Sequence, residues 1–519
     1  MKNGLIHHFI THAKSTPYKS AIIFDGEVYS YRELEKRISN ACEFLSASGL
    51  KKGDRFCISL YNSLEFTVLL FAAADLGLVI VPVDPSLPDD SIRKSGLFTC
   101  AKVLISADSS HLKPQIKPGL RNGFQKIIHI SQVIDFLNKE HSYELGRNSG
   151  QEELDYLFTM TSGSTGSPKP IVLSQAVKLK RSLNSARDLY GLSESDVILT
   201  SSPMHHSLAT RLALLPLLIG ATSVILKQFS PTLWLDAVEN HRVTFNIAVS
   251  VFFEKILKEQ QRKPRDLDSL KCLVSSSSLL PSEVKQQCLD FFQCEFHECY
   301  GTSEIGIATN LSPGAMHKHL GSVGRAISGV ELKILSDERR ELPVSGIGEI
   351  ACDSITAFSG YFDLPGKTRE SFHGDYFLTG DLGYLDGEGY LYLAGRKSDM
   401  IIVGGINVYP KDVESVLSKH EAVDEVAVIG IPDRHFGEVI CAVVILAAGY
   451  TKEETEKQLK KLCAKDLADH QQPMLFDFVN SLPKTALGKI KKQQLATNYQ
   501  DLDLTSGLRK YLSRAGKKT

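Results

Sequence analysis

Residues 159–170 read TMTSGSTGSPKP and bring hydroxyl groups, glycines and one lysine into a single short segment. The apolar runs YLF and IVL flank it, so we expect a tight connection between two strands. Glycine lets the backbone approach a ligand closely and point several N–H groups at one anion. Pro168 and Pro170 exclude a nucleotide loop that opens a helix at Lys169, because a helix cannot begin and propagate between two prolines. The segment predicts a phosphate-binding loop, with a plain flexible loop as the alternative.

A second candidate segment is YGTSEIG, residues 300–306, which follows the alternating, strand-like CEFHEC. It places Thr302, Ser303 and Glu304 in a glycine-containing turn. Hydroxyl groups there can bind a phosphate, and a glutamate beside phosphates is a hard-oxygen ligand for Mg²⁺. An ordinary turn is the alternative.

The segment FLTGDLGYLDGEGYLYLAGR, residues 377–396, places Asp381 after a Thr-Gly turn and Arg396 at the end of a short hairpin. A carboxylate that accepts from two ribose hydroxyls is a familiar nucleotide contact, and a nearby arginine can serve ribose or phosphate. A solvated aspartate in a turn is the alternative.

Two adjacent glycines, Gly404 and Gly405, lie between an apolar strand and a helix that we expect to begin at Pro410. Their spacing favours a hairpin turn; passage of a narrow ligand beside the backbone is the other interpretation. The stretch LPKTALGKIKK contains Lys489, for which local sequence predicts only a basic surface.

A zinc site is a weak alternative for Cys294, His297 and Cys299. A strand would point Cys294 to the face opposite the other two, and no fourth ligand follows at zinc-like spacing. We therefore do not predict zinc binding.

The composition is that of a soluble globular protein. Of 519 residues, 43% are hydrophobic and 23% charged, and the net charge of −1 gives no reason to expect nucleic acid or an anionic membrane as a partner. The ten cysteines are scattered without a Cys-x-x-Cys pair, and the first residues indicate an amphipathic helix instead of a signal peptide, so we expect a cytoplasmic protein. Apolar runs near 66–85 and 212–226 are interrupted by Asp, Gly or Pro, which predicts a buried helix and core strand in each and no transmembrane segment.

The elements that must position these segments alternate between helical and strand-like patterns from residue 20 to about 395. That alternation predicts an α/β fold with layered sheets and helices and much parallel sheet. We expect a large N-terminal body of several subdomains over residues 1–396, closed by a β-rich subdomain over about 311–396. A small α+β domain is expected over residues 397–519.

In identity, order and spacing, these motifs resemble those of the AMP-forming adenylate ligases, the superfamily of acyl-CoA synthetases, luciferases and adenylation domains. The resemblance covers nearly the whole chain and is nearest to the fatty-acyl and aryl-CoA ligase branch. It rests on VYSYRELEKRISNACEFL, GDRF, TSGSTGSPK, PMHHS, YGTSE, TGD, GRKSDMIIVGGINVYP and PKTALGKIKK. It implies ATP and Mg²⁺ as cofactors and a reaction in two steps. A carboxylate attacks the α-phosphate of ATP to give an acyl-adenylate and pyrophosphate, and a thiol then displaces AMP.

The resemblance also implies roles for particular residues. Lys489 would bridge the substrate carboxylate and the α-phosphate, Ser303 would hold the AMP phosphate, and Glu304 would hold Mg²⁺. His206, in PMHHS, would lie between acyl pocket and thiol tunnel; a packed polar residue is the alternative. The implied nucleotide and thiol-channel positions are Thr161, Ser162, Gly163, Ser164, Thr165, Gly166, Lys169, Tyr300, Gly301, Thr302, Asp381, Arg396, Gly404 and Gly405.

In this family the small C-terminal domain is mobile and pivots between the half-reactions, which would place the hinge near Ser398. Acidic residues or lysine are usual at that position. Pro170 and Gln175 also depart from the family pattern, where glycine and histidine are common. These departures keep open a non-catalytic sensor of nucleotide or acyl-adenylate as an alternative function.

The acyl substrate is expected to be a fatty or aromatic acid, because the walls between residues 206 and 310 are largely apolar. Coenzyme A is the expected acceptor, and the alternative is an acyl-AMP ligase that loads the phosphopantetheine of a carrier protein. We expect a monomer or a homodimer.

Overall fold

The computed structural model describes residues 4–107, 123–140, 143–147, 153–161, 169–433, 436–485 and 490–499. The chain forms two compact units. Unit 1 consists of residues 1–332, 351–377 and 389–391, and unit 2 of residues 333–350, 378–388 and 392–519. These units are cut at other points than the domain boundary expected between residues 396 and 397, which stays a prediction.

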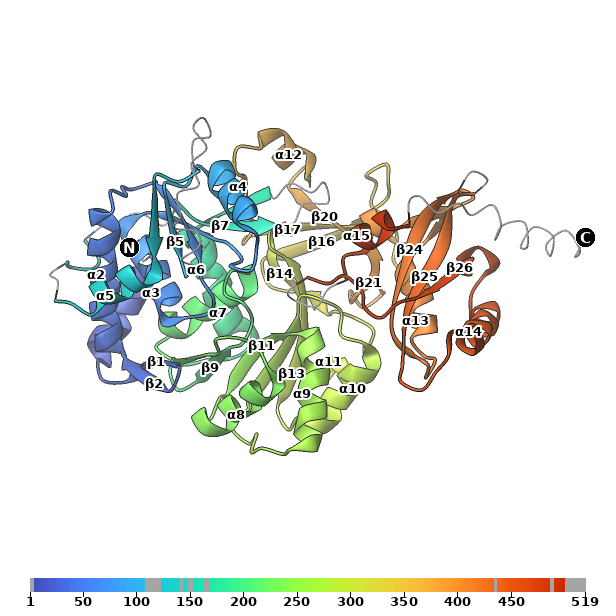
Figure 1. Cartoon of the computed structure of the whole chain (residues 1–519), viewed down its shortest axis with the longest axis horizontal. Helices are drawn as coiled ribbons and strands as arrows, with labels where there is room; N and C mark the ends of the chain where they lie inside the picture. Colours follow the sequence, from blue (N-terminus) through green and yellow to red (C-terminus); the bar gives the residue numbers. More distant parts are fainter. Residues whose placement is uncertain are drawn as a thin grey trace, which may run out of the picture. The chain divides into compact units, whose positions relative to one another are not determined.

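Unit 1 contains a seven-stranded sheet in the order β18-β8-β7-β4-β3-β5-β6 (Figure 1). The strands from β7 to β6 pair in parallel, whereas β8 and β18 are antiparallel additions at one edge. The strands are β3 (Arg55–Ser59), β4 (Val79–Pro82), β5 (Val103–Ser106), β6 (Lys126–His129), β7 (Asp155–Thr161), β8 (Lys169–Ser174) and β18 (Gly360–Tyr361).

A nine-stranded sheet in the order β15-β14-β13-β12-β11-β9-β10-β1-β2 forms the second layer of unit 1. Its central strands are parallel, and β2, β14 and β15 pair antiparallel at the two ends. The strands are β1 (Ser20–Phe24), β2 (Glu27–Ser30), β9 (Val197–Thr200), β10 (Thr222–Ile225), β11 (Phe245–Val249), β12 (Cys272–Ser276), β13 (Glu295–Thr302), β14 (Gly306–Leu311) and β15 (Arg325–Ala326).

Helices between these strands begin and end at residues with the expected chemistry. Ser30 and Glu33 form a capping box on α2, and Gly77, with φ +63°, ends α3 in the left-handed region. Helix α6 continues as the π-turn η2 (Ser185–Leu189). The helices are α1 (Leu5–Ser15), α2 (Tyr31–Ala47), α3 (Leu64–Leu76), α4 (Asp89–Thr99), α5 (Ile130–Leu137), α6 (Gln175–Asn184), α7 (Ser207–Leu218), α8 (Pro231–His241), α9 (Ser250–Arg262), α10 (Ser282–Phe291), α11 (Pro313–Met316) and α12 (Pro365–Glu370).

Both apolar runs fold as the sequence predicts. Helix α3 precedes the buried strand β4, and α7 precedes the buried strand β10. Among the described residues, no helix combines the length and the apolar character needed to cross a membrane.

The later part of the chain is rich in strands, as expected. A five-stranded sheet has the order β16-β17-β20-β19, with β21 paired to β20. Its strands are β16 (Val330–Leu335), β17 (Gly348–Ser354), β19 (Phe372–His373), β20 (Tyr376–Leu385) and β21 (Leu391–Arg396).

The end of unit 2 has its own sheet, in the order β23-β22-β25-β24 with β26 on β25, and its own hydrophobic core. Val413 and Leu417 from α13 and Leu459 from α14 are buried in this core. The elements are β22 (Ile401–Val403), β23 (Ile406–Val408), α13 (Pro410–Leu417), β24 (Val423–Asp433), β25 (Gly437–Leu446), α14 (Lys452–Asp466), β26 (Leu475–Phe478) and α15 (Lys492–Thr497). The predicted α/β class and the strands and helices of this region are confirmed.

Candidate active site

The predicted phosphate loop connects two paired strands, as expected. Strands β7 and β8 are antiparallel, and Thr161 at the end of β7 is the register partner of Lys169 at the start of β8. The other predicted loop positions, Ser162–Gly166, lie outside the described residues. Thr161 and Lys169 are therefore the strand residues at the two ends of the loop.

The YGTSE segment forms the tight end of the β13–β14 hairpin, where Thr302 pairs with Gly306. Two glycines are required by the geometry. A Cβ atom at Gly301 would lie 1.9 Å from the carbonyl oxygen of Gly306, and Gly306 itself has φ +82°. Tyr300, just before this turn, is buried.

Arg181 of α6 holds the YGTSE turn by its backbone. Its guanidinium group donates to the carbonyl oxygens of Ser303 (2.9 Å), Glu304 (2.7 Å) and Thr356 (2.8 and 3.0 Å). Burial, followed by the repulsion of nearby Arg211, lowers the pKa of Arg181 to about 9. Sequence analysis missed Arg181, because a single arginine in a helix has no local pattern that marks it.

Tyr361 links two of the predicted motifs. Its hydroxyl donates to Glu304 Oε1 at 3.0 Å, and the Lys169 ammonium lies 5.5 Å from the centre of its ring. This contact arises because β18, which contains Tyr361, pairs with β8, which begins at Lys169. Burial raises the pKa of Tyr361, and the carboxylate of Glu304 adds to that effect. Sequence analysis missed Tyr361 as well.

Glu304 fits the predicted magnesium ligand. One carboxylate oxygen accepts from Tyr361, and the other makes no hydrogen bond to a residue that the structure describes. A carboxylate oxygen is the ligand type that Mg²⁺ prefers. Bound there, Mg²⁺ would neutralise charge on the phosphates of a nucleotide.

His206 lies directly before α7 and is mostly buried beside His205, with 4.3 Å between the ring centres. Burial, reinforced by His205, lowers the pKa of His206 to about 4. Its Nε2 atom has no hydrogen-bond partner within the described parts of the chain. His206 is therefore a neutral imidazole near pH 7, and its Nε2 atom is buried.

In unit 2, Asp381 and Arg396 form an ion pair with 2.9 Å between Arg396 Nε and Asp381 Oδ1. Arg396 ends strand β21, as the hairpin prediction requires. The Thr-Gly turn expected before Asp381 is wrong, because Thr379 and Gly380 lie inside strand β20 and Gly380 takes φ +71° without ending it. Asp381 is consequently only 8% exposed, not solvated.

Gly404 and Gly405 form the two-residue turn between β22 and β23, where Val403 pairs with Ile406. Their φ values are +57° and +83°, and a turn of this length needs positive φ at both central positions. The hairpin interpretation is confirmed. The expected hinge residue, Ser398, lies in the short 3-10 turn η3 (Lys397–Asp399), and Lys489 lies outside the described residues.

Potential metal ligands around His297 differ from those considered in the sequence. In the described part of the chain, Cys272 and Glu295 join His297, and the ligand atoms lie within 4.8 Å of one another. The parallel register of β12 and β13 aligns Cys272 with Glu295. These are three potential ligands, whereas a structural zinc site takes four.

Comparison with known families identifies the family to which a chain with this site belongs. Residues 9–362 match the AMP-binding enzyme family, and residues 412–489 match the C-terminal domain of AMP-binding enzymes. The chain belongs to the AMP-binding enzymes.

Individual relatives of this AMP-binding enzyme match over nearly their full length. It is 30% identical over 505 residues to the indoleacetate–CoA ligase of Aromatoleum aromaticum, covering 93% of this chain and 96% of the relative. It is 30% identical over 487 residues to the 2-succinylbenzoate–CoA ligase of Bacillus subtilis, covering 93% and 96%.

Solved structures of the same family share its fold. ATP-bound MatB from Rhodopseudomonas palustris superposes with a TM-score of 0.89 at 27% identity, covering 96% of this chain and 99% of that one. The o-succinylbenzoate CoA synthetase of Bacillus subtilis, in complex with its acyl-adenylate intermediate, has a TM-score of 0.84 at 27% identity, covering 94% and 97%. This AMP-binding enzyme is an AMP-forming ligase of the acyl-CoA synthetase type, which activates a carboxylic acid with ATP.

Proposed function

We propose that this enzyme joins a fatty or aromatic carboxylic acid to coenzyme A through an acyl-adenylate. The observation that carries the proposal is the cluster of Lys169, Tyr361 and Glu304 at the end of the phosphate loop. It supplies the two charges that a magnesium–nucleotide complex needs, a cation for phosphate oxygens and a carboxylate for the metal. Activity in the cytoplasm by a monomer or homodimer completes the proposal.

The first step joins two anions. A carboxylate oxygen of the acid attacks the α-phosphorus of ATP, and the bond to pyrophosphate breaks. Lys169 and the loop from Thr161 through Gly166 bind the β- and γ-phosphates, and the Ser303 side chain binds the α-phosphate. Arg181 contributes by holding the turn that carries Ser303 and Glu304, because it donates to both of their carbonyl oxygens. Tyr300, Gly301 and Thr302 complete the nucleotide-binding turn.

Unit 2 supplies the remaining groups. Asp381 accepts from the ribose hydroxyls, and Arg396, already paired with it, keeps that carboxylate oriented. Lys489 bridges the attacking carboxylate and the α-phosphate. The Gly404–Gly405 turn lines the path of the thiol in the second step, after rotation about Ser398, with His206 between acyl pocket and thiol tunnel. The thiol then loses its proton, its sulfur attacks the acyl carbon, and the bond to AMP breaks.

The acceptor has one serious alternative. Coenzyme A ligases for indoleacetate and 2-succinylbenzoate are among the relatives, which supports coenzyme A and an aromatic acid. The fatty acid–[acyl-carrier-protein] ligase ScoC of Streptomyces coeruleorubidus is 27% identical over 501 residues, covering 94% of this chain and 95% of the relative. Transfer to the phosphopantetheine of a carrier protein is therefore the second candidate.

The test is acid-dependent pyrophosphate release from ATP and Mg²⁺ over a panel of fatty and aryl acids, with and without coenzyme A. Lys489→Ala should lower the rate about 100-fold or more, because it removes positive charge at the developing transition state. Lys491→Ala, two positions further along, is the matched control and should retain the wild-type rate. Release by the Lys489→Ala variant at the wild-type rate would contradict the proposed role of Lys489. Release that coenzyme A fails to stimulate, but an acyl carrier protein does, would select the second candidate.

A further inference from the structure

Unit 1 buries a group of three cations, of which the proposed reaction uses only Arg181, to hold the YGTSE turn. Lys178 and Arg181 lie on α6, and Arg211 lies on α7. Lys178 is 0% exposed, Arg181 5% and Arg211 6%. Because Lys178, Arg181 and Ser185 recur at helical spacing of three and four residues, one stripe of α6 and its π-turn presents them together.

Of these three cations, Arg181 lies near a carboxylate, that of Glu304, whose charge raises the pKa of Arg181 against the effect of burial. Arg181 satisfies its donors with backbone carbonyls. Among the described residues, Lys178 Nζ and Arg211 Nε have no hydrogen-bond partner, and neither side chain forms an ion pair with a carboxylate. Burial lowers the pKa of Lys178, and the neighbouring charges of Arg181 and Arg211 lower it further. A buried lysine can avoid the cost of an unpaired charge by losing its proton, whereas an arginine keeps its charge, so Arg211 is the group that an anionic ligand would compensate.

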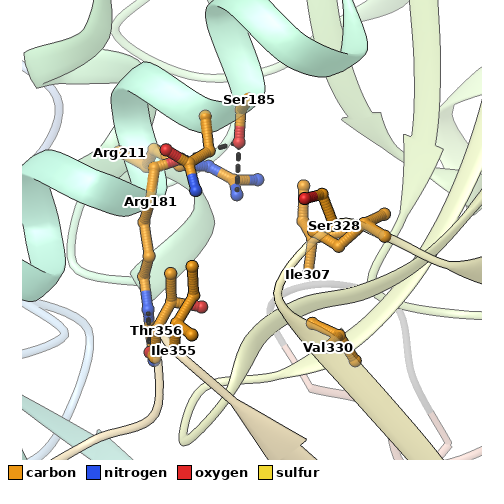
Figure 2. A pocket seen from close by; sticks show the side chains of 10 residues that line it. Arg181, Ser185, Arg211, Ile307, Ser328, Val330, Ile355 and Thr356 are labelled. Carbon is orange, nitrogen blue, oxygen red and sulfur yellow. Dashed lines mark hydrogen bonds between the residues drawn. The ribbon is translucent and has the colours of Figure 1, made fainter.

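Arg211 and Arg181 both line a small open cleft within unit 1. Figure 2 shows Arg181, Ser185 and Arg211 projecting from the helices on one side, with Ile307, Ser328 and Val330 on the other. The Arg211 guanidinium donates to the Ser185 hydroxyl at 3.4 Å, and that hydroxyl donates to the carbonyl oxygen of Arg181 at 2.7 Å. One wall of the cleft is thus cationic and the other is mainly aliphatic.

We propose that this cleft binds the carboxylate of a small organic acid, with Arg211 as the group that contacts it. An arginine offers a planar pair of donors that matches a carboxylate, and its unpaired Nε belongs to that pair. The aliphatic wall favours an acid with a hydrocarbon body over inorganic phosphate. The carboxylate is either the distal end of a dicarboxylic substrate or belongs to a separate acid, and the first of these rests on the proposed function.

Binding is tested first, on the full-length enzyme without ATP, by calorimetry with adipate and with inorganic phosphate. Arg211→Met should weaken adipate binding about tenfold or more, since a hydrogen-bonded charge is lost. The exposed Arg187 lies on the π-turn that follows α6, so Arg187→Met is the matched control and should bind like wild type. Arg211→Lys retains the charge without the planar donors and should bind with intermediate affinity, which also covers the case that Arg211→Met does not fold. Equal adipate binding by wild type and a folded Arg211 variant, or equally tight binding of phosphate, would overturn the proposal.

The source of the carboxylate is tested by pyrophosphate release with hexanoate and adipate. If the substrate itself is a diacid, Arg211→Met should lower kcat/KM for adipate about tenfold or more and leave hexanoate unchanged. If the carboxylate belongs to a separate acid, adipate should change hexanoate turnover in wild type without being consumed, and not in Arg211→Met. Either result supports the site. Absence of release with every acid, while Arg211-dependent binding persists, would refute the proposed function and leave the binding site standing.

Discussion

Two lysines of unit 1 are both completely buried, but the partners of their ammonium groups differ. Lys285, on α10, lies with its ammonium 2.5 Å from Glu298 Oε2 and also donates to the carbonyl oxygens of Leu320 and Ser322. Lys178, on α6, has no hydrogen-bond partner among the described residues and lies near two arginines. Lys285 is thus paired with a carboxylate and two carbonyl groups, whereas Lys178 has no such partner in the described part of the chain.

The neighbouring elements explain the difference. Strand β13 carries Glu298 in the sheet, where Glu298 also accepts from the backbone N–H of Leu280 at 3.0 Å. A carboxylate and a lysine that share several hydrogen bonds recover much of their desolvation cost. The charged residues that helices α6 and α7 bury are all cations. Burial of a charged side chain therefore does not by itself indicate a ligand. Burial without a partner in the protein does.

The largest effect is expected from breaking the compensated pair. Lys285→Met should lower the free energy of unfolding by about 3–5 kcal/mol, because it removes the cation that is paired with the buried carboxylate of Glu298. Urea denaturation measures this. The double variant Lys285→Met/Glu298→Leu should recover most of the loss, and a single-variant loss below about 1 kcal/mol would show that the pair contributes little.

Removing the unpaired ammonium group of Lys178 should change the free energy of unfolding in the opposite direction. Lys178→Met keeps a long unbranched side chain and removes an unsatisfied buried donor, so the free energy of unfolding should rise by about 1–3 kcal/mol. The exposed neighbour Lys180 supplies the control, and Lys180→Met should change stability little. A marked loss of stability in Lys178→Met would mean that the ammonium has a structural partner.

The pH dependence of stability sharpens the same comparison. The pKa of Lys178 in the folded protein lies well below 10.5, its ordinary value. Between those two values the unfolded chain binds the proton and the folded chain does not, so stability rises with pH. Relative to Lys178→Met, wild type should gain up to about 1.4 kcal/mol per pH unit in this window, and nothing above it. Urea denaturation of both proteins from pH 7 to pH 10 measures the difference, and parallel curves would contradict the lowered pKa.

The smallest effect belongs to an exposed pair. Arg396 is 47% exposed where it meets Asp381, so water and salt screen the attraction. Arg396→Met should cost less than about 1 kcal/mol of unfolding free energy, and the cost should shrink further at high salt. AMP binding, measured by calorimetry, should weaken in the same variant if Arg396 serves the nucleotide. A loss of several kcal/mol would place Arg396 with Lys285 as a structural cation.

Some of the site was predictable because its signals are local. The glycines of the YGTSE turn and of Gly404–Gly405 report backbone conformations that other residues adopt with difficulty, and both hairpins form where expected. The same reasoning predicted a turn before Asp381, and this prediction is wrong because Gly380 takes positive φ inside a continuous strand. A glycine reports a conformation of its own residue, and whether the strand continues depends on the neighbouring strands.

Arg181 and Tyr361 were not predictable from sequence, and the reason is distance along the chain. Tyr361 reaches Glu304 because β18 pairs with β8, almost 190 residues earlier. Arg181 meets the turn at Ser303 more than 100 residues later. Neither residue has neighbours in sequence whose spacing marks it.

The sequence by itself determined the α/β class, the order of the motifs and thereby the family, because turn chemistry and hydrophobic periodicity act over a few residues. Only the tertiary structure decided which charged groups meet. It brought Lys169 to the ring of Tyr361 and Glu304 to its hydroxyl, and it gave Lys285 a carboxylate. Within the described part of the chain, it left Lys178 and Arg211 without one. The energy of a buried charge depends on the groups within a few ångströms of it, and long-range packing selects those groups.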